Sequence, residues 1–263
     1  MGAMPLSCTQ ESLARDLRRL GLHAGMTVLV HSSLRRLGWV SGGAAAVVQA
    51  LMNAVTEQGT LIMPAYTGNY SDPASWQNSL EPQPWWQMIY EAMPAFDPLA
   101  TPTYQVGVIA ETFRTSPGVS RSNHPHVSFS AWGRHAESVT AHHSLEYGLG
   151  EGSPLAHIYE LDGSVLLLGV GYDRNTSFHL AEYRSPGAVP VLLGAPIIED
   201  GQRAWKKFRD IQINADVFPT IGAEMEQANL VKIGTVGLAQ CRLFPQRSAV
   251  DFAVQWYKQR SHL

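Results

Sequence analysis

Residues 164–182 constrain the fold more than any other part of this chain, because a buried strand there leads directly into a helix. The segment opens with Ser-Val-Leu-Leu-Leu-Gly, a continuous apolar run that is typical of a strand covered on both faces of an α/β sheet. Asn175 or Thr176 can cap the helix that follows. His179 and Glu182 are three residues apart and therefore share one face of that helix. The spacing indicates either a histidine base with its orienting carboxylate or an ordinary surface pair.

The N-terminal third repeats this alternation of helix and strand. Ser7-Cys8-Thr9-Gln10 resembles a capping box, and apolar residues at helical spacing follow it up to Gly21. A second helical pattern covers residues 44–55, and apolar strand patterns cover residues 27–31 and 60–65. This order predicts an α/β fold with a central, mostly parallel or mixed sheet that is covered by helices on both sides.

Residues 66–103 interrupt the alternation with several prolines and three tryptophans. They predict a long aromatic, proline-rich insertion that is a functional loop region rather than a linker. Residues 189–214 favour hairpins around Glu199-Asp200-Gly201-Gln202, and Ser248 can cap a final helix that ends at Gln259. We therefore expect one domain over residues 7–260 with a smaller, β-rich C-terminal part.

Composition narrows the class of protein. Of 263 residues, 45% are hydrophobic and 16% are charged, and the formal net charge is -3 with both signs dispersed, so we expect no nucleic-acid partner. The sequence has neither an export leader nor a run of about 18 apolar residues. Cys8 and Cys241 have no metal-ligand spacing. These features predict a reduced, soluble, cytoplasmic protein that does not contact membranes.

A second chemical motif follows the strand at residues 27–31. Backbone N–H groups at Ser32, Ser33 or the Gly42-Gly43 helix start can bind phosphate oxygens, with Arg35 and Arg36 adding positive charge. The chain lacks both the dinucleotide-binding glycine pattern and the P-loop, which points away from nicotinamide and P-loop nucleotides. The alternative is an ordinary turn with solvated arginines.

Ten histidines raise the question of a metal site. No His-Glu-x-x-His occurs, and Pro125 prevents His124 and His126 from sharing a helical face, so we expect no metal. The alternative for His124 is a hydrogen-bonded core residue. The Gly-x-Ser-x-Gly elbow of serine hydrolases is also absent.

Five motifs in order carry a resemblance to a known family. They are Val-His-Ser-Ser-Leu at 30–34, Gly-Thr-Leu-Ile-Met-Pro at 59–64, Arg-Ser-Asn-His-Pro at 121–125, Gly-Ser-Pro-Leu at 152–155, and the strand and Asn-Thr-Ser-Phe-His-Leu-Ala-Glu helix within 166–182. Together they resemble the aminoglycoside 3-N-acetyltransferase family over roughly residues 7–260. The resemblance implies an α/β fold unlike that of GNAT acetyltransferases. It also implies acetyl transfer from acetyl-CoA to the 3-amino group of a 2-deoxystreptamine antibiotic, and hence antibiotic resistance.

The resemblance also implies roles for single residues. The catalytic histidine and glutamate of the family fall on His179 and Glu182. The resemblance assigns coenzyme binding to Ser32, Ser33, Leu34 and Gly43. It places Arg121, Ser122 and His124 near the pantetheine or beneath the site. Asp210 is the expected downstream substrate carboxylate, with Asp216 as the second choice.

Acyl transfer to an amine dictates the rest of the expected site. Only a deprotonated amine attacks a thioester, so His179 acts as the base and Glu182 orients it. The helix N-terminus disfavours the imidazolium and the carboxylate favours it, which leaves His179 able to accept a proton near neutrality. The Thr176 hydroxyl or the N–H groups of residues 175–177 can stabilise the oxyanion, and the step requires no metal.

The acceptor side is less defined by the sequence. A polycationic acceptor needs a local acidic field, for which we expect Asp72, Glu151 and Asp210 beside Glu182. The insertion at residues 66–103 is expected to shape the acceptor site, unless its tryptophans only attach a loop to the body or to a partner in a possible homodimer. Two alternatives remain: an acetyl-CoA-dependent transferase acting on another amine, such as an amino sugar or an aminophosphonate nucleotide, and a coenzyme-binding protein without turnover.

Overall fold

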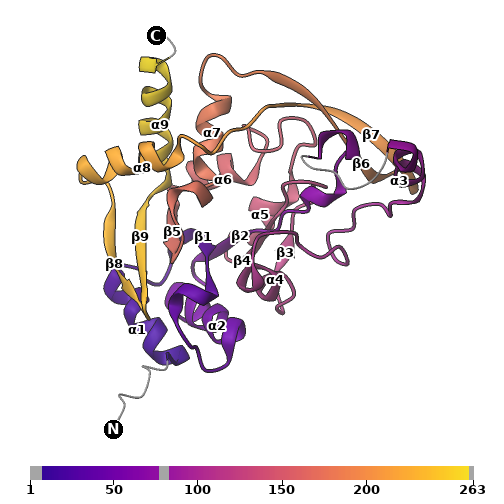
Figure 1. Cartoon of the computed structure of the whole chain (residues 1–263). Helices are drawn as coiled ribbons and strands as arrows, with labels where there is room; N and C mark the ends of the chain where they lie inside the picture. Colours follow the sequence, from indigo (N-terminus) through magenta and orange to yellow (C-terminus); the bar gives the residue numbers. More distant parts are fainter. Residues whose placement is uncertain (1–7, 77–82, 261–263) are drawn as a thin grey trace.

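The computed structural model describes residues 8–76 and 83–260 and has a seven-stranded mixed sheet at its centre (Figure 1). Across the sheet the strand order is β3-β4-β2-β1-β5-β9-β8. The bounds are β1 (Thr27–Ser32), β2 (Thr60–Pro64), β3 (Ser120–Arg121), β4 (Phe129–Gly133), β5 (Ser164–Leu168), β8 (Lys232–Val236) and β9 (Ala239–Pro245). β1 pairs in parallel with β2 and with β5, whereas the other pairings are antiparallel. The predicted α/β fold with a mixed sheet is therefore confirmed.

Two hydrophobic cores lie on the two faces of this sheet, and alternate strand residues supply them. On β1, Val28 and Val30 pack into one core and Leu29 into the other, and all three are buried. One core is covered by α1 (Gln10–Leu20), α2 (Gly43–Val55) and α4 (Val108–Arg114). The other is covered by α5 (Ala136–Ala141), α6 (Pro154–Glu160), α7 (Ser177–Tyr183), α8 (Phe218–Gln227) and α9 (Gln246–Arg260). Because both faces are covered, the central strands read as continuous apolar runs.

The first and last helices begin at other residues than the sequence pattern predicts. Thr9, not Ser7, is the N-cap of α1, and its hydroxyl accepts from the N–H of Ser12 at 3.2 Å while Ser12 Oγ accepts from the N–H of Thr9 at 2.9 Å. Ser7 itself lies outside the described residues. The predicted cap at Ser248 is wrong, because α9 begins at Gln246 directly after β9. The N–H of Gln246 donates instead to the carbonyl of Gly163 at 2.8 Å.

A second, two-stranded sheet consists of β6 (Pro190–Glu199) and β7 (Gln202–Ile211). The turn between them, Asp200-Gly201, has positive φ at both residues, as a tight two-residue hairpin requires. The hairpin predicted at this turn is therefore confirmed. Figure 1 shows it extending away from the central sheet. The smaller β-rich part is this hairpin, whereas β8 and β9 belong to the central sheet.

The hairpin packs against the aromatic, proline-rich insertion. The described part of residues 66–103 contains the short turns η2 (Gly68–Tyr70), η3 (Pro73–Ser75) and η4 (Gln83–Trp85) and the helix α3 (Trp86–Ala92), which lies beside the hairpin in Figure 1. The ring of Tyr90 meets that of Trp205 edge-on, with centroids 4.8 Å apart. The N–H of Phe96 donates to the carbonyl of Pro196 at 2.9 Å. We call the hairpin and this insertion together the outer lobe.

No helix in the described ranges has the length and apolar character needed to cross a bilayer.

Candidate active site

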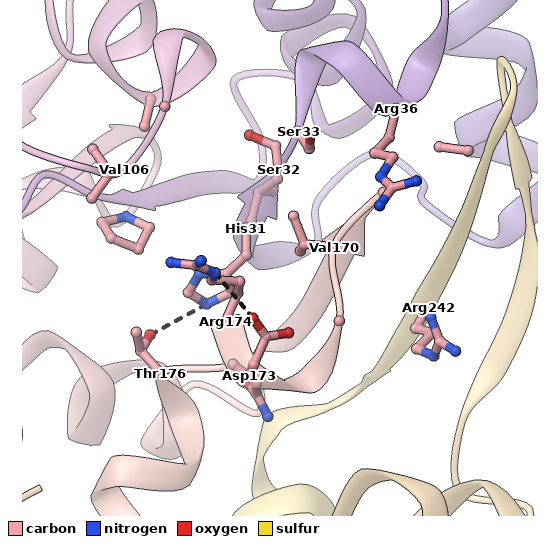
Figure 2. A pocket seen from close by; sticks show the side chains of 18 of the residues that line it. His31, Ser32, Ser33, Arg36, Val106, Val170, Asp173, Arg174, Thr176 and Arg242 are labelled. Carbon is pink, nitrogen blue, oxygen red and sulfur yellow. Dashed lines mark hydrogen bonds and ion pairs between the residues drawn. The ribbon is translucent and has the colours of Figure 1, made fainter. Parts of the chain in front are cut away.

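A cavity of about 900 Å³ opens where β1 and β5 end side by side (Figure 2). Ligands of α/β sheets bind at this carboxyl end of parallel strands. Its wall combines segments that are distant in the chain. They are His31, Ser32, Ser33 and Arg36 at the end of β1 and after it, residues 169–171 and 173–176 after β5, His179 on α7, residues 105–107 and Ala110 at the start of α4, and Leu238, Ala239, Gln240 and Arg242 on the β8–β9 side.

The predicted base lines this wall and contacts the predicted carboxylate. His179 Nδ1 is 2.5 Å from Glu182 Oε2, and both side chains are about nine-tenths buried. The other carboxylate oxygen of Glu182 accepts from the N–H of Asn214 at 2.9 Å. The carboxylate is thus held from two sides, and Nδ1 is the nitrogen that faces it. In this orientation Nε2 is the nitrogen left to exchange a proton with a ligand.

Thr176 precedes α7 and faces a second histidine in the cavity. Its hydroxyl oxygen is 3.2 Å from Nε2 of His31, and both side chains are buried. Burial, together with the nearby His179 and Arg174, lowers the pKa of His31 to about 3, so this imidazole is neutral at physiological pH. Sequence reasoning missed His31. Its signal was a titratable residue at the polar end of an apolar strand, in the Val-His-Ser-Ser motif.

Of the predicted coenzyme-binding residues in the first loop, Ser32 and Ser33 line the cavity. Leu34 and Gly43 are not among the described lining residues; Leu34 packs against a hydrophobic core instead, and Gly43 begins α2. Two helix starts reach the wall, that of α4 through Gly107 and that of α7 through Thr176. Gly107 has a φ of +89°, a conformation that favours glycine. The glycine itself was the signal that the sequence offered for this position.

Three arginines give the cavity a positive lining. They are Arg36, Arg174 and Arg242, and they come from three different elements (Figure 2). Asp173 is the only acidic side chain among the described lining residues and contacts Arg174 at 3.1 Å. Arg242 contacts Glu226 behind the wall at 2.6 Å. Such a lining suits a ligand that carries several phosphate groups.

Arg121 and Ser122 lie outside the cavity lining and hold backbone together. The Arg121 guanidinium donates to the carbonyls of Ala65 at 2.6 Å and Thr101 at 2.5 Å, and its Nε donates to Ser128 Oγ at 3.0 Å. Ser122 is fully buried, and its hydroxyl oxygen accepts from the N–H of Phe129 at 2.9 Å. These contacts indicate that both residues attach the insertion and the neighbouring loop to the sheet.

Two buried histidines, His124 and His126, and the partly buried His143 form a cluster beside Ser122 at the base of the outer lobe. The His124 and His143 rings are 4.6 Å apart, and His126 contacts the carbonyl of Gly194 on β6 through Nε2 at 3.2 Å. His124 Nδ1 accepts from the N–H groups of His126 and Val127, both at 3.1 Å, which confirms the interpretation of His124 as a hydrogen-bonded core residue. In the part of the chain that the structure describes, no group of three His, Cys, Asp or Glu side chains is arranged to hold a metal ion.

Each of the three predicted substrate carboxylates has a partner within the chain. Asp72 accepts from the Tyr90 hydroxyl at 2.6 Å in the outer lobe. Glu151 accepts from Arg184 through two hydrogen bonds of 2.7 and 2.9 Å. Asp210 is buried and accepts from the Tyr183 hydroxyl at 2.5 Å. None of the three is among the described residues of the cavity wall.

A histidine–glutamate pair at the carboxyl end of a mixed α/β sheet, beside a cationic cavity, is an arrangement that suits acyl transfer from a phosphate-bearing donor. Residues 29–258 match the family described as aminoglycoside 3-N-acetyltransferase. The chain belongs to this family.

Individual relatives agree with the match. The SPbeta prophage-derived aminoglycoside N(3')-acetyltransferase-like protein YokD of Bacillus subtilis (strain 168) is 49% identical over 95% of this chain and 92% of its own length. The crystal structure of YokD superposes with a TM-score of 0.96 at 47% identity, covering 99% of this chain and 96% of that one.

Two solved structures of relatives hold ligands. AAC-IIIb, in a binary complex with CoASH, has a TM-score of 0.87 and 31% identity and covers 97% of each chain. AAC-VIa, bound to sisomicin, also has a TM-score of 0.87 and 31% identity, covering 96% of this chain and 98% of that one.

Proposed function

We propose that this protein transfers the acetyl group of acetyl-CoA to the 3-amino group of a 2-deoxystreptamine aminoglycoside, a reaction that confers antibiotic resistance. The observation that carries the proposal is the contact of 2.5 Å between Glu182 and His179, which lines a cationic cavity. Glu182 occupies Nδ1 of the imidazole, and Nε2 is available to remove the proton of an amine. Membership of the family and the CoASH complex of AAC-IIIb support acetyl-CoA as the donor.

The cavity is the proposed coenzyme site. Its lining brings Ser32 and Ser33 together with Arg36, Arg174 and Arg242, and coenzyme A carries three phosphate groups that suit these side chains. Arg121, Ser122, Leu34 and Gly43 lie outside the lining, so in this proposal they act on the coenzyme site only through the backbone that they support.

The proposed reaction is a direct attack without an acyl-enzyme. The neutral amine nitrogen forms a bond to the thioester carbon, and His179 takes the proton that the amine loses. The carbon–oxygen double bond reforms from the tetrahedral intermediate, the carbon–sulfur bond breaks, and the sulfur leaves as coenzyme A after receiving a proton from the imidazolium. Glu182 stabilises that imidazolium, and Thr176 donates to the oxyanion.

The acceptor is proposed to approach His179 from the side of the outer lobe. The sisomicin complex of AAC-VIa supports an aminoglycoside in this role. Asp72, Glu151 and Asp210 are the proposed sources of negative charge, and Glu182 adds to them. The reaction is proposed to take place in the cytoplasm, where acetyl-CoA is made, with a homodimer as one possible state of the enzyme.

One observation favours a second class of acceptor. Asp72 accepts from Tyr90, Glu151 is bound to Arg184 and Asp210 accepts from Tyr183, so all three proposed carboxylates are already engaged within the chain. A polycation must replace or share these partners, whereas an amine with less positive charge need not. An amino sugar or an aminophosphonate nucleotide is such an amine.

Release of the coenzyme A thiol, measured with each acceptor class, tests both proposals. We expect turnover with a 2-deoxystreptamine aminoglycoside and an acetylated 3-amino group by NMR of the product. His179→Ala should lower the rate about 10²–10⁴-fold, Glu182→Gln should lower it less, and both should keep the fold and the coenzyme affinity. His157→Ala, at a half-exposed histidine on α6 outside the cavity lining, is the control. Activity of His179→Ala within about threefold of the wild type would contradict the base assignment.

A further inference from the structure

We propose that His31 is a positioning residue that directs the proton of the Thr176 hydroxyl toward the thioester carbonyl oxygen. The inference rests on the proposed acetyl transfer and adds a residue to its oxyanion site. His31 belongs to β1 and Thr176 lies at the start of α7, 145 residues later. Figure 2 shows the imidazole and the hydroxyl facing each other across the cavity wall.

The contact places one nitrogen of His31 on the threonine oxygen. Nε2 is 3.2 Å from Oγ1, and the two side chains are only 7% and 8% exposed, so little solvent competes for either atom. A threonine hydroxyl has one proton and two lone pairs. When Nε2–H of His31 donates to one lone pair, the hydroxyl proton is directed to another acceptor. The carbonyl of a ligand in the cavity is that acceptor in the proposed reaction.

Tyr66 lies beside the same hydroxyl and lines the cavity as well. Burial raises the pKa of its phenol and the Thr176 hydroxyl lowers it, but no hydrogen bond joins the two hydroxyl groups. A phenol that stays protonated is a second donor on the cavity wall.

The charge of His31 matters because His179 is nearby. Tyr66 lines the same cavity, and the charged or titratable groups that act on the His31 ring are His179 and Arg174. A protonated His31 would oppose the imidazolium that forms on His179 when the amine loses its proton. Burial and these neighbours keep the pKa of His31 near 3, so it remains a neutral donor throughout the working pH range. The two histidines therefore have separate tasks, one in proton transfer and one in orientation.

Thiol release by variants of both partners tests the coupling. Removing one oxyanion donor costs about 10²–10³ in kcat, and we expect that loss for Thr176→Val. We expect His31→Leu to lower kcat about tenfold to a hundredfold, with both KM values within about twofold. His31→Gln, which keeps an N–H donor, should recover part of the rate. The double variant should be no slower than Thr176→Val alone, because His31 acts through Thr176.

The controls separate this inference from general damage. His157→Leu should leave kcat unchanged, and thermal unfolding of each variant should show that the fold survives. Independent losses that multiply in the double variant, or a loss confined to the KM for acetyl-CoA, would overturn the positioning role. Should His31→Leu fail to fold, His31→Gln combined with Thr176→Val provides the same cycle.

A measurement that does not need turnover distinguishes this inference from the proposed function. Nitrogen-15 NMR of the His31 ring reports which nitrogen carries the proton, with and without coenzyme A. We expect a neutral ring protonated at Nε2 between pH 6 and 8, since the pKa lies near 3. A ring protonated at Nδ1 alone, or a cationic ring, would overturn the inference. If the wild type released no thiol with any acceptor, the proposed acetyl transfer would be wrong. The NMR measurement would still show which nitrogen of His31 carries the proton that faces Thr176.

Discussion

The cavity at the end of β1 and the outer lobe are stabilised in different ways. In the cavity, polar side chains such as His31 and Thr176 project from the ends of strands and from the loops that follow them, and the sheet beneath is apolar on both faces. The outer lobe is held by individual polar and aromatic contacts. Arg203 donates to the carbonyl of Met93 at 2.7 Å, and the Tyr90 and Trp205 rings meet edge-on.

This difference indicates how proteins of one fold can share a catalytic site and still bind different acceptors. A rigid sheet fixes catalytic side chains to within the small tolerances that proton transfer needs. A lobe made of a hairpin and an irregular insertion can change its residues without moving that sheet. The comparison predicts that damage to the lobe shows first in stability or acceptor binding, whereas damage to the cavity shows first in turnover or coenzyme binding.

The largest effect on stability is expected for Arg121→Met. The change leaves the carbonyl of Thr101 without its side-chain donor and removes one of the two side-chain donors to the carbonyl of Ala65, and we expect the free energy of unfolding to fall by about 3 kcal/mol. Urea unfolding monitored by fluorescence measures it. Arg35→Met is the control, because Arg35 is exposed and lies outside the cavity lining. A raised KM for acetyl-CoA at unchanged stability would instead indicate that Arg121 binds the coenzyme.

Gly148→Ala should destabilise the histidine cluster at the base of the lobe. A Cβ at this position would lie 2.5 Å from His124 Nε2 and 2.8 Å from Val127 Cγ2, so buried groups must shift. Such overpacking costs about 2 kcal/mol, measured by the same unfolding experiment. Gly68→Ala offers a matched change, since a Cβ there meets no atom within 4 Å. Equal stability of the two variants would show that the cluster can adapt.

Arg36→Gln should affect the cavity and spare the lobe. We expect the KM for acetyl-CoA to rise about fivefold, equivalent to about 1 kcal/mol, because one phosphate-binding charge is lost. The rise should shrink at high ionic strength, while the KM for the acceptor stays the same. Arg35→Gln removes the adjacent charge outside the lining and should change neither constant. Similar effects of the two variants would mean that the net charge of the surface, and not the cavity, attracts the coenzyme.

The smallest effect is expected for Asp72→Asn in the outer lobe. Asp72 is bound by Tyr90 through its side chain and by the N–H of Ala74, so a substrate ammonium shares it with these donors. We expect the acceptor dissociation constant to rise about twofold to threefold at low salt and coenzyme affinity to stay unchanged. Isothermal titration with both ligands measures this. An unchanged acceptor affinity would assign this part of the insertion to the scaffold.

Some features of the protein follow from short stretches of sequence. The central strands are recognisable as apolar runs because both faces of the sheet are covered, and the Asp200-Gly201 turn marks the hairpin because few residues adopt its backbone. His179 and Glu182 meet because residues three apart share a helix face. Each of these relations is local, so the sequence determines it before the chain is packed.

Other features depend on which segments the tertiary structure brings together. His31 meets Thr176 because β1 and β5 are parallel neighbours, and no local pattern contains that pairing. Gly107 rather than Gly43 reaches the cavity because of where α4 packs, and Arg121 lies away from it because its guanidinium fills the gap between the insertion and the sheet. Side chains of the same chemical type can bind a ligand or hold a loop. The position of the surrounding elements decides between these roles, because it determines which acceptors lie within hydrogen-bonding distance.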